Sequence, residues 1–460
     1  MTTPTSHAIS LNPTTGEPLQ AYAYDSDALL EQTLARASGG FAAWRRQPLA
    51  ARSEAMVRLA TVLRAEAGAL AETITLEMGK PITQARAEVE KCANLCEWYA
   101  EHGPAMLHTE ATPVEGRRAV IEYRPLGTLL AVMPWNFPLW QVLRGAVPAL
   151  LAGNTYVLKH APNVMGSAYR LKAAFEAAGF PAGVFEVSNL LNPQVARAIQ
   201  DPRIAAVTVT GSVRAGSAIG ALAGAALKKC VLELGGSDPF IVLADADLDA
   251  AVSNAIIGRY QNTGQVCAAA KRLIIEDSLY AAFSERFTAA AAQLVVGDPL
   301  QADTYIGPMA RYDLRDELHG QVQASLGEGA QLLLGGHKVE GAGNYYAPTV
   351  LGEVTPNMTS FRQELFGPVA SLIRARDAEH ALALANDSDF GLTASIFTAD
   401  VARAQAMAAQ LDTGGVFING FSFSDPRVSF GGVKQSGFGR ELSHFGVREF
   451  TNAQTVWDRS

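Results

Sequence analysis

From about Gly127 onward, short runs rich in β-branched residues alternate with stretches of helical periodicity. The series begins with GTLLAVM (127–133) and a helix expected to reach Leu151, followed by TYVLKHA (155–161) and a helix to Ala178. This alternation predicts a parallel sheet with helices on both faces, because parallel strands need crossover connections. The chain is therefore expected to have an α/β fold.

The alternation falls into two series that meet near Leu234–Ser237. The first continues through FEVSNL, IAAVTVTG and VLELGG, and the second contains PFIVL, RLIIED, QLLLGG, SLIRA, ASIFT and GVFING. Two α/β domains are therefore predicted. The segment before about Gly103 has mostly helical periodicity. Two further β-like segments, 117–125 and 451–458, fit neither series and are expected to pair with each other or with a neighbouring subunit.

Composition and charge exclude several classes of function. The 460 residues carry a formal net charge of −8 with scattered Lys and Arg, so no nucleic-acid partner and no membrane-surface patch are expected. The N-terminal MTTPTSHAIS has neither the basic nor the apolar region of a secretory signal. The most apolar stretch, 126–153, is interrupted by three prolines and Arg144, which argues against a membrane span.

Four cysteines in so long a chain do not form a disulfide framework, and a reducing cytosol is the expected compartment. Cys92 and Cys96 lie four residues apart, hence on one helical face. Because no second His or Cys pair is near them, they are interpreted as small buried hydrophobes. No metal site is expected.

Cys267 stands in QNTGQVCAAAKR (261–272), among small neighbours that would leave a nucleophilic thiol accessible. No histidine is close in sequence to act as its base, so these residues alone favour a buried thiol. Glu233 lies in the apolar run VLELGGSDPF (231–240). Burial would raise the pKa of its carboxyl and suit it to general base catalysis, and a solvated strand end is the alternative.

Two further motifs follow predicted strands. In MPWNFPLW (133–140), two prolines bracket Asn136, whose amide can stabilise an oxyanion or simply cap the next helix. In TVTGSVRAG (208–216), a strand ends at Gly211 and Ser212. Such a turn can approach a phosphate, although it is not GxGxxG, and an ordinary βα turn is the alternative.

The four motifs together, in this order and at these intervals, resemble the aldehyde dehydrogenase superfamily over nearly the whole chain. VLKHAPN (157–163), QELFGPV (363–369) and SFGGVKQSGFGRE (429–441) extend the resemblance. It implies that Cys267 attacks an aldehyde to form a thiohemiacetal, whose oxyanion is held by the Asn136 amide and the Cys267 backbone N–H. Hydride transfer to a nicotinamide cofactor would leave a thioester. Glu233 would activate the water that hydrolyses it, which favours release of a free acid over transfer to coenzyme A.

The resemblance also implies a cofactor site and a domain division. The cofactor residues would be Trp135, Lys159, Asn163, Gly211, Ser212, Glu364 and Phe366. It further implies an aldehyde dehydrogenase-like fold with a Rossmann-like cofactor domain (1–110 and 127–234), an α/β catalytic domain (235–440) and a small β oligomerisation element (111–126 and 441–460). The protein would be a homodimer or homotetramer.

One departure from the family pattern concerns the choice of cofactor. Members that strongly prefer NAD usually carry a glutamate three residues after the lysine, where this chain has Pro162. A carboxylate there would repel the 2′-phosphate of NADP, so its absence predicts that NADP is accepted alongside NAD.

Three stretches, NFPLWQVLRGAVPALLAGN, CAAAKR and SDPRVSFGG, look like the branch that includes bacterial succinate-semialdehyde dehydrogenases. Arg144 and Arg427 are candidates to bind a substrate carboxylate through paired hydrogen bonds, and pairing with a local acid is the alternative for each. Phe137 and Phe430 are expected to contact substrate. The substrate hypothesis is succinate semialdehyde. The rivals are a dehydrogenase of broad specificity for lactaldehyde, glutarate semialdehyde or aromatic aldehydes, and a non-catalytic binding protein on the same fold.

Overall fold

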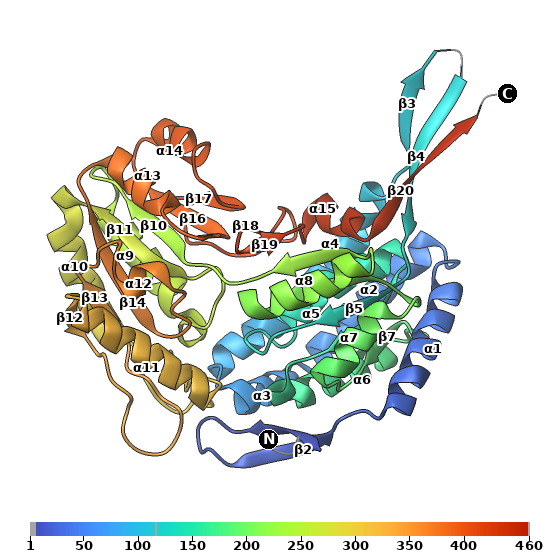
Figure 1. Cartoon of the computed structure of the whole chain (residues 1–460), viewed down its shortest axis with the longest axis horizontal. Coiled ribbons are helices and arrows are strands. Elements are labelled where there is room, and N and C mark those ends of the chain that lie inside the picture. Colours follow the sequence, from blue (N-terminus) through green and yellow to red (C-terminus); the bar gives the residue numbers. More distant parts are fainter. Residues whose placement is uncertain (1–5, 116, 459–460) are drawn as a thin grey trace.

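The computed structural model describes residues 6–115 and 117–458. Two large sheets occupy two lobes, and a small sheet projects from one of them (Figure 1). The first sheet has the strand order β19-β9-β8-β5-β6-β7, in which only β19 is antiparallel to its neighbour. Its strands are β5 (Thr128–Val132), β6 (Thr155–Lys159), β7 (Phe185–Val187), β8 (Ile204–Thr210), β9 (Lys229–Glu233) and β19 (Gly437–Phe438).

Helices cover both faces of this first sheet, and successive residues of its strands point alternately into the two cores on these faces. Leu129 and Ala131 pack into the core with helices α2, α4, α5 and α6, whereas Leu130 between them packs with α1, α7 and α8. These helices are α1 (Asp27–Trp44), α2 (Leu49–Ala65), α4 (Ile82–Met106), α5 (Trp140–Ala152), α6 (Met165–Ala177), α7 (Asn192–Gln200) and α8 (Val213–Ala225). Helix α3 (Ala67–Met78) packs against α4. The predicted two-sided parallel sheet is confirmed.

The second sheet has the order β12-β13-β14-β11-β10-β16-β17, with β12 antiparallel at one edge. Its strands are β10 (Asp238–Val242), β11 (Ala270–Glu276), β12 (Gln331–Leu334), β13 (Thr349–Gly352), β14 (Val369–Ala375), β16 (Thr393–Phe397) and β17 (Gly415–Ile418). The accompanying helices are α9 (Leu248–Tyr260), α10 (Asp277–Ala292), α11 (Tyr312–Gly327), α12 (Thr359–Arg362), α13 (Ala378–Asn386) and α14 (Val401–Ala408). Strand β9 ends at Glu233 and β10 begins at Asp238, so the chain passes from the first sheet to the second within residues 234–237.

The two segments that fitted neither series pair with each other. Strand β20 (Thr451–Asp458) runs antiparallel to β4 (Arg117–Pro125), and β3 (Glu110–Val114) pairs with the other edge of β4. This three-stranded sheet stands away from the rest of the chain (Figure 1). Helix α15 (Ser443–Glu449) leads into β20 and packs against α4 and α5.

Two details of the first 103 residues differ from simple helical periodicity. A hairpin, β1 (His7–Leu11) with β2 (Pro18–Ala23), precedes the helices. The apolar helical periodicity is also interrupted at Glu66, which separates α2 from α3. Cys92 and Cys96 are completely buried in the core around α4, as predicted.

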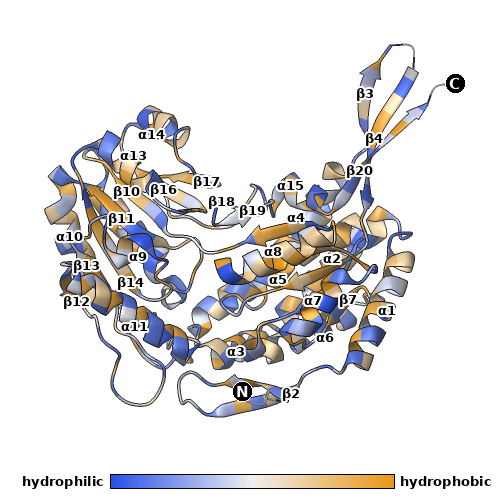
Figure 2. Ribbon diagram, viewed as in Figure 1, coloured by the Kyte–Doolittle hydropathy of each residue, from blue (hydrophilic) through white to orange (hydrophobic). Residues whose placement is uncertain are grey.

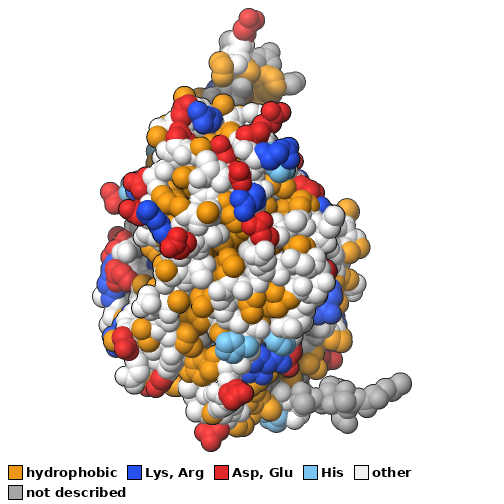
Figure 3. Space-filling model, turned by 90° about the vertical axis from the view of Figure 1, so that its left-hand side faces the viewer, with side chains coloured by type: hydrophobic (Ala, Val, Ile, Leu, Met, Phe, Trp, Pro, Cys, Tyr) orange, Lys and Arg blue, Asp and Glu red, His pale blue; other side chains and the backbone are white. Residues whose placement is uncertain are grey.

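The strands of both large sheets are mostly hydrophobic, and hydrophilic residues lie toward the outside of the helices (Figure 2). The face shown in Figure 3 carries acidic and basic side chains interspersed with hydrophobic and other residues. One small antiparallel strand pair completes the fold: β15 (Phe390–Gly391) pairs with β18 (Val433–Lys434). In the described part of the chain, no helix is long and apolar enough to cross a membrane.

Candidate active site

Cys267 lies in the turn between the 3₁₀ helix η2 (Gln261–Gly264) and strand β11. Asn262 and Thr263 in this turn have φ angles of 53° and 56°, in the left-handed region that L-residues rarely adopt. Surrounding contacts hold them there: the Asn262 N–H donates to Gln84 Oε1 at 2.7 Å and the Thr263 hydroxyl to the Gly307 carbonyl at 3.2 Å. Strained backbone maintained in this way is often found at functional sites.

Asn136 lies beyond the carboxyl end of β5 and contacts the cysteine turn. Its Nδ2 donates to the Gln265 carbonyl at 3.0 Å, and its own carbonyl accepts from Asn262 Nδ2 at 2.8 Å. The Asn136 side chain is buried and lines the same cleft as Cys267. An amide nitrogen has two donor hydrogens, so one remains for an oxyanion beside the sulfur.

Glu233 is the last residue of β9, at the carboxyl edge of the first sheet. It is only 2% exposed, and neither carboxylate oxygen has a hydrogen-bond partner in the described structure. Burial raises the pKa of Glu233 to about 8, opposed by Arg144 and reinforced by Glu441. A buried carboxyl without partners has both oxygens available to accept a proton, as a general base requires.

Burial acts against ionisation of the Cys267 thiol. Burial raises the pKa of Cys267 to about 11, while the positive charges of Arg144 and Lys271 oppose the shift and Glu233 adds to it. The mutual effect of Cys267 and Glu233 places them within electrostatic range of each other. Formation of the nucleophilic thiolate therefore needs a proton acceptor.

Glu364 links the seam to the cysteine turn. Its Oε1 accepts the Gly236 N–H at 3.1 Å and pairs with Lys271 Nζ at 3.0 Å, and the same ammonium donates to the Cys267 carbonyl at 2.6 Å. A Cβ on Gly235 would lie 2.2 Å from Glu364 Oε2. The absence of a side chain at Gly235 therefore leaves room for the Glu364 carboxylate at this position.

A cleft of about 610 Å³ opens between the two sheets. Its lining includes most of the predicted nucleophile, oxyanion and cofactor residues: Cys267, Asn136, Trp135, Gly211, Ser212, Glu364 and Phe366. The rings of Trp135 and Phe366 meet edge to face with centroids 5.7 Å apart. Gly211 faces open space, and the Ser212 hydroxyl caps α8 by accepting from the Ala215 N–H at 3.3 Å.

This lining fits a dinucleotide, because a helix N-terminus and a Cβ-free turn face the cleft beside an aromatic pair. Lys159 and Asn163 are not among the lining residues. Lys159 ends β6, with its pKa lowered by burial, and the buried Asn163 Nδ2 lacks a hydrogen-bond partner among the described residues. A dinucleotide bound in the cleft would contact Lys159 and Asn163 only if it extended along the edge of the first sheet.

The two arginines predicted to bind substrate have different surroundings. Arg144 is 1% exposed, its Nε pairs with Glu441, and its Nη2 is buried without an acceptor in the described structure. Its guanidinium carbon lies 4.6 Å from the centre of the Phe430 ring. Arg427 is largely exposed and forms a two-pronged pair with Asp425 at 2.7 and 2.8 Å, the alternative foreseen for it. Its substrate role stays a prediction.

Phe137 follows Asn136 and is partly buried. Lys80 Nζ lies 3.7 Å from the centre of its ring. Its neighbours Leu139 and Trp140 donate their backbone N–H groups to Glu88 Oε1 at 2.9 and 3.0 Å. The turn that carries Asn136 therefore rests on charged side chains from α4 and from the loop before it.

Three residues of the site have roles that sequence reasoning missed: Lys271, Glu441 and Glu88. Lys271 follows the alanines of CAAAKR, and its place at the start of an apolar strand is the signal that could have marked it. Glu441 lies 297 residues from Arg144 and Glu88 lies 51 from Leu139. No local pattern connects positions so far apart.

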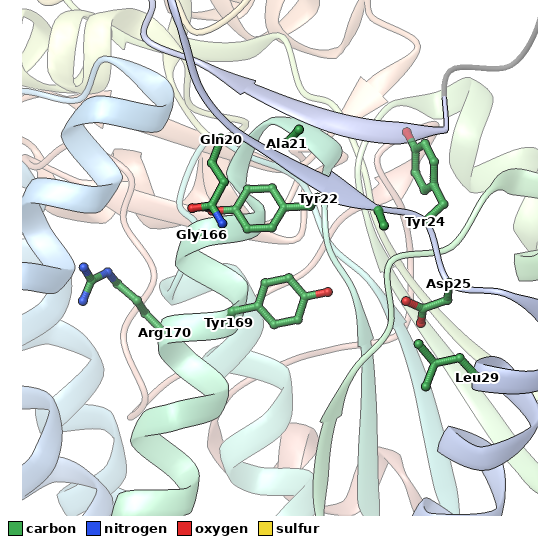
Figure 4. Close-up of a pocket in the computed structure, with 10 residues that line it drawn as sticks. Gln20, Ala21, Tyr22, Tyr24, Asp25, Leu29, Gly166, Tyr169 and Arg170 are labelled. Carbon is green, nitrogen blue, oxygen red and sulfur yellow. Dashed lines mark hydrogen bonds between the residues drawn. The ribbon is translucent and has the colours of Figure 1, made fainter.

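A second hollow, of about 600 Å³, lies between β2 and α6 (Figure 4). The stacked rings of Tyr22 and Tyr169, 5.6 Å apart, form part of its wall, and Asp25 and Arg170 are at its ends. Its lining contains none of the residues gathered around Cys267. Within residues 6–115 and 117–458, no group of three or more His, Cys, Asp or Glu side chains is arranged to hold a metal ion.

Comparison with known proteins agrees with this geometry. A succinate semialdehyde dehydrogenase [NAD(P)+] of Escherichia coli is 64% identical over 455 residues, covering 99% of this chain and 98% of the relative. A succinate-semialdehyde dehydrogenase [NADP(+)] of Mycolicibacterium paratuberculosis is 45% identical, with 97% and 96% covered. The crystal structure of succinic semialdehyde dehydrogenase from Streptococcus pyogenes in complex with NADP+ superposes with a TM-score of 0.96 at 35% identity, covering 98% of this chain and 99% of that one.

The expected superfamily, and the fold that goes with it, are confirmed by these relatives and by a family description. The "Aldehyde dehydrogenase family" matches residues 2–456, which include the cysteine turn, the seam and the strand that ends at Glu233. With its sequence matched almost from end to end and with Cys267 and Asn136 lining one cleft, this chain belongs to the aldehyde dehydrogenase family.

Proposed function

We propose that this protein oxidises succinate semialdehyde to succinate, with NADP or NAD as the electron acceptor. The observation that carries the proposal is that Cys267 and Asn136, from two different sheets, line one cleft that also fits a dinucleotide, with Glu233 close enough for its charge to act on the thiol. Relatives named for this reaction share 64% and 45% of their aligned residues with the chain.

The reaction begins at the sulfur of Cys267. The thiol first gives its proton to water; the thiolate then attacks the aldehyde carbon, forming a C–S bond as the carbonyl π bond opens, and the oxygen becomes an oxyanion that Asn136 Nδ2 stabilises. Such donors act mainly on charge that develops in the transition state, so they lower the barrier more than they strengthen binding. When bound in the cleft, an oxidised nicotinamide accepts the hydride that leaves the former aldehyde carbon.

Hydrolysis then completes the cycle. Glu233 takes a proton from water, whose oxygen attacks the thioester carbon; the C–S bond breaks, and the acid leaves as Cys267 regains its thiol. The unpartnered carboxylate oxygens of Glu233 are free to accept that proton. Division into acylation and deacylation replaces one difficult step by two easier ones.

The lining of the same cleft suggests which residues would bind each part of the cofactor. Gly211 and Ser212 would hold the pyrophosphate region, Glu364 the nicotinamide ribose, and Trp135 with Phe366 would line the cleft. Lys159 and Asn163 would hold the adenosine end. Pro162 is exposed in the turn Pro162–Val164, which offers no carboxylate to repel a 2′-phosphate. We therefore propose that both NADP and NAD are used.

Arg144 supports a substrate that carries its own carboxylate. Its unfilled Nη2 donor is buried close enough to Cys267 and Glu233 for their charges to interact with it. A carboxylate at the far end of a four-carbon aldehyde would supply the missing acceptor. Replacement of Arg144 by Leu should raise KM for succinate semialdehyde far more than for butanal. Equal effects on the two aldehydes would show that Arg144 is not the anchor.

The deciding experiment is an assay of reduced nicotinamide formation with succinate semialdehyde and each cofactor. We expect turnover with NADP and with NAD. A preference for NAD of more than about a hundredfold, roughly 2.7 kcal/mol, would contradict the cofactor assignment. A panel containing lactaldehyde, glutarate semialdehyde and benzaldehyde tests the broad-specificity alternative, which requires similar kcat/KM values across the panel. Absence of turnover with every aldehyde would favour a non-catalytic binding protein.

We further propose the division into a cofactor domain (1–110 and 127–234), a catalytic domain (235–440) and an oligomerisation element (111–126 and 441–460). The projecting sheet β20-β4-β3 supports the last assignment, because its outer strands are available to a second copy of the chain. A cytosolic homodimer or homotetramer follows as the working assembly. Sedimentation of the purified protein tests the assembly.

A further inference from the structure

Lys91, on α4, has its ammonium enclosed by an aromatic ring and a hydroxyl. Its Nζ lies 4.0 Å from the centre of the Trp140 ring and donates to Ser424 Oγ at 3.1 Å. The indole Nε1 of Trp140 donates to the same Ser424 oxygen at 2.9 Å. A serine hydroxyl has two lone pairs and one proton, so Ser424 still has its own O–H to donate.

The charge of Lys91 is not matched by a carboxylate. No ion pair of the described residues includes it, and the charged groups that face it are Glu88 and Cys92 on its own helix, Arg144 on α5 and Asp425 in the loop after β17. The two acids in this set already have cations: Glu88 pairs with Lys80, and Asp425 pairs with Arg427. Burial, with the repulsion of Arg144, lowers the pKa of Lys91 to about 8.

Helix α5 connects Lys91 and its partner Trp140 to the residues around Cys267. Trp140 and Arg144 are four residues apart on α5 and hence lie on one helical face. Arg144 in turn interacts electrostatically with Cys267 and Glu233 and keeps its Nη2 without an acceptor. The positive charges of Lys91 and Arg144 therefore lie within electrostatic range of each other, and two donors, Arg144 Nη2 and the Ser424 O–H, are unused beside them. Buried cations need a counter-charge, and a ligand can supply it.

We propose that Lys91 is a specificity-determining residue whose ammonium, with Arg144 Nη2 and the Ser424 hydroxyl, binds the carboxylate of an ω-carboxylated aldehyde. The inference rests on the proposed function and adds to it a cation on a different helix. A carboxylate has enough acceptor positions for all three donors, and its negative charge offsets the unmatched cation. An uncharged aldehyde of the same length gains neither effect.

This arrangement makes selectivity depend on pH. In the free enzyme the ammonium loses its proton as the pH rises through about 8, and the charge attraction is then lost. The ratio of kcat/KM for succinate semialdehyde to that for butanal should therefore fall between about pH 7 and pH 9.5. Titration of groups that serve both substrates, such as Cys267 and Glu233, largely cancels in this ratio.

The experiment compares wild type, Lys91→Met, Lys91→Arg and a control, Lys338→Met, which removes a surface lysine that pairs with Asp316. Both aldehydes are assayed at each pH, and thermal unfolding checks that each variant is folded. In Lys91→Met the ratio should fall by about 10- to 100-fold at pH 7 and lose its pH dependence, since a hydrogen bond to a charged group is removed. Lys91→Arg should keep a high ratio at every pH, because a guanidinium does not titrate in this range. The control should match wild type.

A folded Lys91→Met that keeps the wild-type ratio and its pH dependence would overturn the role of Lys91, even where wild type prefers succinate semialdehyde. If Lys91→Met does not fold, a wild-type pH dependence in Lys91→Arg overturns it as well. A wild type that shows no preference for succinate semialdehyde over butanal would instead remove the proposed substrate. The two failures are therefore distinguishable.

Discussion

Lys80 and Glu88 form an ion pair whose side chains are 1% and 2% exposed. The remaining oxygen of Glu88 accepts the backbone N–H groups of Leu139 and Trp140 at the start of α5. The pair therefore joins the beginning of α4 to the turn that presents Asn136. Desolvation lowers the pKa of Lys80, and Glu88 opposes that shift, so the ammonium depends on its partner to remain charged.

Removal of one member of this ion pair should lower the free energy of unfolding substantially. Glu88→Ala leaves a buried ammonium and two backbone donors without partners, so we expect the free energy of unfolding to fall by about 3–5 kcal/mol. The double variant Lys80→Met, Glu88→Leu should lose less, because no charge is left buried. Denaturant unfolding of both variants checks this order. Equal stability of Glu88→Ala and wild type would contradict it.

Replacement of Cys267 by Ala should reduce aldehyde oxidation by at least about a thousandfold, since no other group can form the covalent intermediate. Binding of the dinucleotide, followed by fluorescence titration, should persist. The matched control is Cys230→Ala, which removes a thiol away from the cleft lining and should retain activity. Turnover close to that of wild type in Cys267→Ala would refute the covalent mechanism.

Glu233→Gln should separate the two halves of the reaction. Acylation can still release about one equivalent of reduced nicotinamide per active site, whereas hydrolysis loses its base and should slow by about 10²- to 10⁴-fold. Rapid-mixing kinetics would then show a burst followed by a slow phase, and mass spectrometry of the intact chain should detect the acyl adduct. A variant with no burst and no adduct would place Glu233 in the first half of the reaction.

Wild-type deacylation should rise with pH up to about 8, the raised pKa of Glu233, because the ionised carboxyl is the active base. An ordinary glutamate, ionised above about pH 5, would give a flat profile over this range. Single-turnover hydrolysis of the acyl-enzyme at several pH values measures the profile directly. A rate that is already constant from about pH 6 would show that Glu233 ionises like an exposed carboxyl.

The Glu233 carboxyl should also affect the stability of the folded protein. Because the folded-state pKa of Glu233 lies above its unfolded value, its ionisation opposes folding increasingly as the pH rises from about 4.5 to about 8. Glu233→Gln removes this cost, so the variant should gain stability relative to wild type across that interval and keep the gain above it. Thermal unfolding at both ends of the interval tests the sign. A gain confined to acid pH would contradict the assignment.

Lys271→Met should weaken both the cofactor site and the cysteine turn, since one ammonium holds Glu364 and the Cys267 carbonyl. We expect kcat/KM to fall by about 10- to 100-fold, with a higher KM for the dinucleotide. Lys434→Met, which removes a more exposed lysine paired with Asp412, is the control. Unchanged kinetics in Lys271→Met would show that the turn keeps its geometry without this link.

The fold was predictable wherever local pattern determines structure. Alternation of β-branched runs with helical periodicity located both sheets and the seam, and the segments 117–125 and 451–458 pair as expected. The hairpin β1–β2 was not foreseen, because its second strand is mostly exposed and lacks a clear alternation. Cys267, Glu233 and Asn136 could be proposed from their motifs; in the structure Cys267 and Asn136 line one cleft, and Glu233 is buried within electrostatic range of Cys267.

The electrostatic support of the site could not be predicted in the same way. Arg144 could be singled out by its position, but its pairing with Glu441 depends on the return of the C-terminal segment to the first sheet. Lys91 gave no local signal, because it lies in an ordinary amphipathic helix and its partners Trp140 and Ser424 come from two distant elements. Such contacts are properties of the tertiary structure rather than of any short stretch of sequence.

Strand β19 pairs with β9, with Gly437 directly opposite Glu233. A polypeptide emerging from the ribosome would thus contain the cysteine turn and every strand of the two large sheets except β19 before the residue opposite Glu233 had been translated. The reactive thiol would exist for a time beside an unfinished water-activating site. Catalytic competence in this enzyme is therefore among the last properties that synthesis of the chain confers.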